Sequence, residues 1–159
     1  MTITRRLARP MLASVFVSAG IDVLRNPGPR AKMAEPLTSA MSSVLPIPDD
    51  TELLVKINAG VQIGAGLLLA TGRAPRVAAA ALAASIIPTT AAGHRFWEES
   101  DPARKAQQQI HFFKNLSILG GLILAAFDTE GAPSLTWRAK QAIESTTAAT
   151  ADAISRVTP

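Results

Sequence analysis

The chain has 159 residues, enough for one domain but not for two. Apolar residues make up 48% of it and charged residues only 18%, against about 25% charged residues in an average soluble domain. The sequence has no cysteine, which excludes a disulfide framework, a thiolate nucleophile and thiolate ligands for zinc or an iron–sulfur cluster. Any redox role would therefore belong to a bound cofactor or a partner.

The first apolar segment runs from about residue 7 to residue 24 and ends at Asn26-Pro27-Gly28-Pro29, a strong helix stop. Its start superficially resembles a secretory signal. However, Ser18-Ala19-Gly20 leads into Asp22 and Arg25 without a clear small-x-small cleavage site. We therefore expect an uncleaved first membrane span.

The next stretch, residues 30–44, predicts a short amphipathic helix lying on a surface. Its apolar side chains recur at helical spacing, and they are Met33, Leu37, Met41, Val44 and Leu45. Pro46-Ile47-Pro48 ends this helix, and the residues at positions 49–51 can cap the next one.

Three more apolar segments follow, at about residues 53–71, 77–92 and 110–127. The tail, residues 134–159, shows weak helical amphipathicity through Leu135, Trp137, Ala142 and Ile143, which predicts an interfacial helix. We thus expect an all-α fold: a four-helix transmembrane bundle over residues 1–133, with an amphipathic C-terminal tail over residues 134–159.

A soluble, alanine-rich four-helix bundle is the alternative, because none of the four segments is a clean run of twenty strongly apolar residues. Two observations favour the membrane. Residues 59–71 and 77–93 carry no charge on any face, whereas a helix of a soluble bundle needs a charged outer stripe. Small residues also recur four positions apart, which predicts close helix packing in lipid, at Gly60, Gly64, Ser117 and Gly121.

The basic residues predict an orientation in the cytoplasmic membrane. Four spans put both termini on one side, where eight Lys and Arg residues would lie against six on the other, acid-rich side. Since basic residues are retained in the cytoplasm, we expect both termini there.

Polar residues at the span ends gather at the opposite, non-cytoplasmic end of such a bundle. We identify eight of them as a candidate ligand-binding pocket: Asp22, Lys56, Asn58, Gln62, His94, His111, Lys114 and Asn115. Ionisable groups within spans usually pair or line a cavity. One reading is a pocket for a quinone head group or a small polar ligand. The other is a structural network, with Asp22 paired to Lys56 or Lys114 and the amides bonded between helices.

The sequence contains no motif for metal binding, nucleic-acid binding or catalysis. His94 and His111 lie in different segments without a metal-binding motif, so we expect no metal site. No basic cluster with interleaved aromatic residues indicates nucleic acid. No catalytic constellation makes an independent case for an enzyme.

Two elements resemble the DoxX family of bacterial membrane proteins. They are Gly93-His94-Arg95-Phe96-Trp97 and the stretch His111 to Gly121, which contains Phe112-Phe113-Lys114-Asn115 and Gly120-Gly121. Further matches are Arg9, the Ala19-Gly20-Ile21-Asp22 stretch, the Leu-Pro-x-Pro-Asp-Asp stretch that ends at Asp50, and residues 69–73. At the position of Asp22 many relatives carry Lys.

The resemblance implies a four-helix membrane fold and a link to redox chemistry. The family is named for its similarity to a subunit of a thiosulfate:quinone oxidoreductase, and some relatives are linked to oxidative-stress complexes with a superoxide dismutase and a sulfurtransferase. Our first hypothesis is a non-catalytic membrane subunit or scaffold that recruits soluble redox or sulfur-transfer enzymes or another membrane subunit. The second is a quinone-interacting subunit of a membrane oxidoreductase, and the third is a small-molecule permease.

Overall fold

The computed structural model describes residues 3–44, 46–129, 131, 137 and 140–147. The chain divides into two compact units, Met1–Phe127 and Asp128–Pro159. In the second unit residues 140–147 are helical, and Trp137 and Ile143 are exposed. Leu135, part of the predicted C-terminal helix, lies outside the described residues.

In the described part of the first unit all regular secondary structure is helical. Its five helices are α1 (Ile3–Arg25), α2 (Gly28–Ser42), α3 (Thr51–Thr71), α4 (Pro75–Gly93) and α5 (Pro102–Phe127). Four of them, all except α2, are long and apolar enough to cross a membrane. The all-α prediction with four spans and a short helix between the first two is confirmed. The predicted fourth span begins at about residue 110, whereas the helix begins at Pro102, because its first turns are polar yet helix-forming.

Local signals account for the helix boundaries. The Asp50 side chain accepts a hydrogen bond of 2.9 Å from the Leu53 amide and caps the start of α3. Gly72 ends α3 in the left-handed conformation, with φ of 70°. Pro75 opens α4, where the missing amide proton has no cost. The Asp101 carboxylate accepts a hydrogen bond of 2.8 Å from the Arg104 amide and caps α5.

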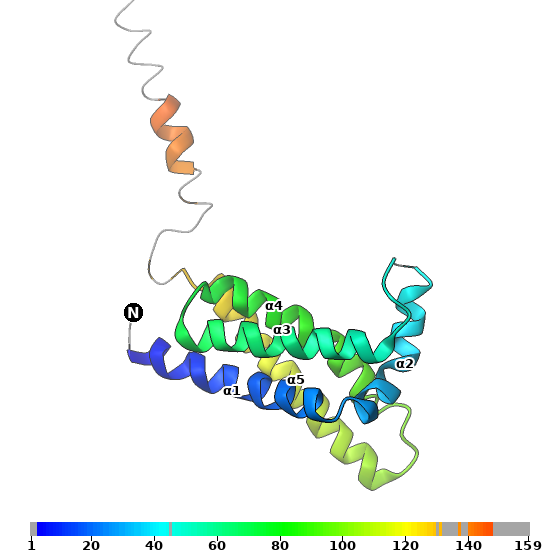
Figure 1. Cartoon of the computed structure of the whole chain (residues 1–159). Coiled ribbons are helices and arrows are strands. Elements are labelled where there is room, and N and C mark those ends of the chain that lie inside the picture. Colours follow the sequence, from blue (N-terminus) through cyan, green and yellow to red (C-terminus); the bar gives the residue numbers. More distant parts are fainter. Residues whose placement is uncertain (1–2, 45, 130, 132–136, 138–139, 148–159) are drawn as a thin grey trace, which may run out of the picture. The chain divides into compact units, whose positions relative to one another are not determined.

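The four long helices pack around one shared core. α3 packs against both α1 and α4, and α4 packs against α5, whereas α1 and α5 touch at few positions. α2 lies across one end of the long helices and contacts α3 and α4 (Figure 1). Leu69, Leu82 and Leu122 are fully buried, surrounded mainly by alanine. Small side chains let the backbones approach closely, which is the packing mode of helices in lipid.

The glycines that allow this approach are not the ones that the spacing predicts. A Cβ atom at Gly20 would lie 2.9 Å from the Ala59 carbonyl oxygen, and one at Gly66 would lie 2.8 Å from Val17 Cγ2. At Gly60 and Gly64 a Cβ atom would meet nothing within 4 Å. Gly60 and Gly64 are exposed on the outer face of α3, so their predicted role in helix packing stays a prediction.

The second predicted pair of small residues, Ser117 and Gly121, lies on α5. A Cβ atom at Gly121 would lie in ordinary contact, 3.8 Å from Leu12 Cδ1. Ser117 is exposed, and its hydroxyl donates to the Phe113 carbonyl oxygen of its own helix at 2.9 Å. Its predicted role in helix packing stays a prediction.

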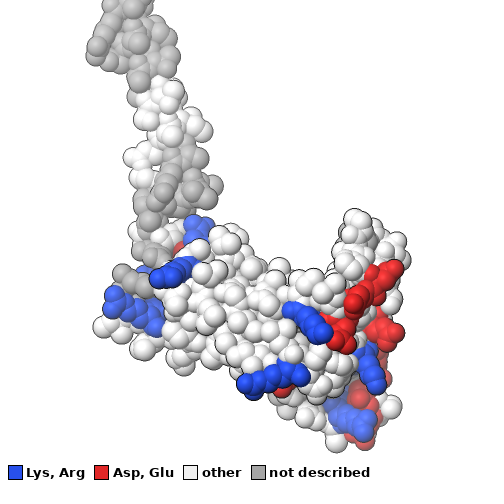
Figure 2. All heavy atoms as spheres, in the orientation of Figure 1, with Lys and Arg blue, Asp and Glu red and all other residues white. Residues whose placement is uncertain are grey.

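The outer surface of the long helices is apolar. Large side chains such as Leu7, Ile57, Leu68, Ile87 and Leu124 are exposed on all four of them. On the face that Figure 2 shows, a zone between the ends is free of charge, with mostly Lys and Arg at one end and mixed acidic and basic side chains at the end where α2 lies. Exposed apolar side chains between charged ends are the surface expected of a bundle that is surrounded by lipid.

Candidate functional site

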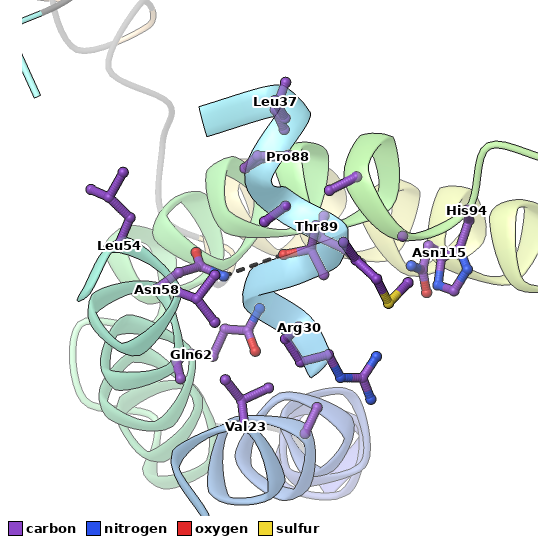
Figure 3. A pocket seen from close by; sticks show the side chains of 18 of the residues that line it. Val23, Arg30, Leu37, Leu54, Asn58, Gln62, Pro88, Thr89, His94 and Asn115 are labelled. Atoms are coloured by element: carbon purple, nitrogen blue, oxygen red, sulfur yellow. Dashed lines mark hydrogen bonds between the residues drawn. The ribbon is translucent and has the colours of Figure 1, made fainter. Parts of the chain in front are cut away.

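A ladder of uncharged side chains joins α3, α4 and α5 near the α2 end of the bundle. The Gln62 side-chain amide donates to Ser85 Oγ at 3.0 Å, and Ser85 Oγ donates to Asn58 Oδ1 at 2.8 Å. The Asn58 amide in turn donates to Thr89 Oγ1 at 3.3 Å (Figure 3). Each step joins α3 to α4, so the ladder fixes the register of these two helices.

A fourth contact extends the polar zone to α5. The Asn115 amide donates to Thr90 Oγ1 at 3.0 Å, and Thr90 Oγ1 donates to the Ile86 carbonyl oxygen at 2.8 Å. Gln62 and Asn115 are buried, with 5% and 9% of their surfaces exposed. Burying a polar group this deeply costs free energy unless the group is hydrogen-bonded, and these hydrogen bonds offset part of that cost.

Beside the ladder lies a cavity of about 560 Å³, within the range that holds one drug-sized molecule. All five helices of the first unit contribute to its wall. The apolar lining residues include Val15, Phe16, Ala19, Val23, Met33, Leu37, Met41, Leu54, Ala59, Ile86 and Ile118. The polar lining residues include Thr38, Asn58, Gln62, Thr89, His94, His111, Lys114 and Asn115.

Two buried amides in this wall keep hydrogen-bonding capacity. A side-chain amide offers two donor hydrogens and two acceptor lone pairs. Gln62 uses one donor, on Ser85, and Asn115 uses one donor, on Thr90, among the residues that the structure describes. Gln62 extends from α3 into the space between α1 and α2 (Figure 3). The cavity thus presents neutral hydrogen-bonding groups within mainly apolar walls.

The short helix α2 closes one side of this cavity. Its apolar residues Met33, Leu37 and Met41 line the cavity, so the amphipathic face predicted to lie on a surface covers a pocket. One polar contact holds each half of α2. Arg30 lies 3.7 Å from Asp22 of α1, and Thr38 Oγ1 lies 2.7 Å from Thr51 Oγ1 of α3.

At another part of the cavity wall the two histidines stack. The rings of His94 and His111 lie 5.2 Å apart at an interplanar angle of 23°. His94 Nδ1 lies 2.7 Å from Gln108 Oε1, and Lys114 Nζ lies 3.5 Å from His111 Nδ1. No group of three or more metal-ligating side chains occurs in the described part of the chain.

An aromatic cluster positions His94 beside α5. The rings of Phe96 and Trp97 lie 5.4 Å and 6.0 Å from that of Phe112, edge to face. Such contacts are worth about 0.5–1.5 kcal/mol each beyond their burial. They hold the segment that follows α4 against the start of the apolar part of α5, which places His94 over His111.

The structure brings together six of the eight predicted pocket residues, namely Asn58, Gln62, His94, His111, Lys114 and Asn115. Asp22 and Lys56 do not line the cavity. Asp22 lies beside Arg30, and Lys56 forms an ion pair of 2.6 Å with Glu52 one turn earlier in α3. The predicted pairing of Asp22 with Lys56 or Lys114 is therefore wrong, because nearer partners of opposite charge are available.

Three contributors to this region were missed. Ser85 bonds two ladder residues, and its signal was its position as the single hydroxyl residue between Ala78 and Ile87. Arg30 and Thr38 line the cavity from α2. Sequence periodicity could not show which residues α2 would cover, since its face fits a membrane surface and a protein surface equally well.

These features define a helical membrane protein with a ligand-sized cavity at one end of its bundle. The chain belongs to the DoxX family, whose model matches residues 5–95, more than half of the sequence. The match contains Gly93-His94-Arg95 and stops before the predicted family element in α5. Neither the comparison with curated proteins nor that with solved structures gave a match.

Proposed function

We propose that this protein is a membrane subunit whose cavity binds a lipid-soluble ligand by its polar head group, and that a quinone is the ligand. The observation that carries the proposal is the buried amide of Gln62, which lines the cavity with hydrogen-bonding capacity to spare. Quinone carbonyl oxygens accept hydrogen bonds, and amide N–H groups donate them. The apolar walls suit the ring and the first part of an isoprenoid tail.

The test is quinone binding by the purified protein in nanodiscs of neutral lipid. We expect ubiquinone-1 to bind the wild type, and Gln62→Leu to weaken binding about tenfold, the loss that follows from one hydrogen bond of about 1.4 kcal/mol. Gln107→Leu is the matched control, because Gln107 is exposed on α5 and does not line the cavity. Wild-type affinity in Gln62→Leu, or no binding by the wild type, would contradict the proposal.

A scaffold for soluble redox or sulfur-transfer enzymes is the second candidate. It is favoured by the mixed charged surface at the α2 end of the molecule (Figure 2), which offers ion pairs to a soluble partner. One comparison of the wild type with Gln62→Leu distinguishes the two proposed functions. Partner enzymes that co-purify equally with wild type and Gln62→Leu, without quinone binding by either, would favour the scaffold.

We further propose the cytoplasmic membrane as the location, with both termini in the cytoplasm. Arg5, Arg6 and Arg9 at the start of α1, with Arg73 and Arg76 around the α3–α4 turn, support this orientation. The cavity would then open toward the opposite side of the membrane, and a role in oxidative-stress defence would act from there.

A further inference from the structure

The cations of the cavity wall differ in how they are compensated. Lys114 and Arg30 line the cavity together with His94 and His111, and no Asp or Glu does so among the residues that the structure describes. Arg30 has Asp22 at 3.7 Å. Lys114 has no carboxylate within 4.0 Å in the described part of the chain, and its Nζ atom lies 3.5 Å from His111 Nδ1.

Lys114 is exposed in the structure, and an uncompensated ammonium group there has a cost because α5 is a candidate membrane span. Lys114 lies in the apolar part of α5, between the cavity residues His111 and Asn115. Ionisable groups in membrane helices usually pair with an opposite charge or face a water-filled cavity. The described residues supply no opposite charge, so a ligand that carries one would gain both the attraction and a charge-assisted hydrogen bond.

The remaining walls restrict the shape of such a ligand. From the polar corner at Lys114, His94 and His111, the cavity continues between apolar side chains of α1, α2 and α3, among them Phe16, Leu37 and Leu54. A volume of about 560 Å³ suits one drug-sized molecule. A ligand with an acidic head group at the polar corner and one hydrocarbon chain along the apolar walls would match both regions of the cavity.

We propose that the cavity is also a binding site for an anionic single-chain amphiphile, with its carboxylate on Lys114 and the His94–His111 pair and its chain under α2. Such a ligand would compete with the neutral quinone-type ligand for the same space. The inference rests on the cavity that the proposed function uses, but not on quinone binding. A neutral ligand has no need of Lys114, so charge separates the two.

The experiment uses the full chain in zwitterionic nanodiscs with a spin-labelled stearate and its methyl ester as probes, at a pH where the stearate is ionised. Immobilised label reports binding. We expect the wild type to bind the stearate at least about tenfold more tightly than the ester, as one charge-assisted hydrogen bond implies. Lys114→Gln should abolish this preference, and Lys114→Arg should retain it. Lys105→Gln, on the polar part of α5 away from the cavity, is the control.

Equal binding of stearate and ester by the wild type would overturn the inference, as would a preference that persists in Lys114→Gln. Ubiquinone-1 binding is measured on the same samples. Quinone binding without stearate preference would refute the anion site alone. Stearate preference without quinone binding would refute the proposed quinone function alone.

Discussion

Two glycines determine how closely α1 approaches α3. At Gly20 an added Cβ atom would meet the backbone oxygen of Ala59 at 2.9 Å and Ile63 Cγ1 at 2.7 Å. Since a backbone atom cannot move aside by a rotamer change, we predict that Gly20→Ala lowers the free energy of unfolding by roughly 1–3 kcal/mol, the usual range for overpacking.

Thermal unfolding in one detergent checks this prediction, with Gly64→Ala as the matched control. Nothing lies within 4 Å of a Cβ atom at Gly64, so its replacement should leave stability unchanged or raise it by up to about 1 kcal/mol through helix propensity. A control that is as destabilised as Gly20→Ala would show that the close approach of α1 is not the cause.

Ser85 is the junction of the polar ladder. Ser85→Ala leaves the Gln62 amide and the Asn58 carbonyl oxygen without their shared partner. With interhelical hydrogen bonds in membrane proteins worth about 0.6 kcal/mol on average and 1–2 in model peptides, we predict a loss of roughly 1–3 kcal/mol in unfolding free energy. Ser117→Ala should cost less than about 0.5 kcal/mol, because Ser117 bonds only its own helix. Equal losses in the two variants would count against the ladder.

At the scale of elements, α2 is the part of the fold with the weakest attachment. None of its residues is fully buried, and one of its polar contacts is the 2.7 Å hydrogen bond between Thr38 and Thr51. We predict that Thr38→Val speeds hydrogen exchange of the backbone amides of residues 28–42, since helices with few buried contacts open locally at low free energy.

The control is Ser42→Ala, which removes a hydroxyl that bonds only the Ser39 carbonyl oxygen within α2. Exchange in α3 and α4 should stay at wild-type rates in both variants. Unchanged exchange of α2 in Thr38→Val would mean that apolar packing alone holds this helix over the cavity.

The elements also show what the sequence can reveal. Charge-free stretches predict α3 and α4 well, because lipid excludes charge from every face of a helix. The place of α2 could not be predicted, because its amphipathic pattern does not say which apolar surface it covers. Likewise, four-residue spacing of small residues identifies a helix face but not its neighbour, and so it pointed to Gly60 and Gly64 rather than Gly20 and Gly66.

The candidate site was predictable where the order of the helices alone decides which polar residues lie close together. Polar residues at neighbouring span ends, such as Asn58 in α3 and Asn115 in α5, must meet at one end of an up-and-down bundle, and both line the cavity. Charge pairing was less predictable, because it depends on rotamers and on the nearest competitor. Glu52 lies one turn from Lys56, and Arg30 becomes a neighbour of Asp22 only after the chain turns at Pro27.

At the scale of the whole molecule, the distribution of basic residues predicts topology. A reporter that is active only in the cytoplasm should give signal when fused after Pro159 and none when inserted after Asp49, in the connection between α2 and α3. A periplasm-active reporter should give the reverse pattern. Cytoplasmic activity at both positions would show that α3, α4 and α5 do not all cross the membrane, and activity after Asp49 alone would invert the orientation.

The central claim is that the cavity beneath α2 is occupied by a membrane-derived ligand, and filling the cavity tests it most directly. Ala34 lines the cavity, whereas Ala40 is exposed on the same helix and does not. Native mass spectrometry of the protein extracted from cell membranes should detect a bound small molecule in wild type and Ala40→Phe and little or none in Ala34→Phe, at similar thermal stability. Equal ligand occupancy in Ala34→Phe and Ala40→Phe would contradict the account.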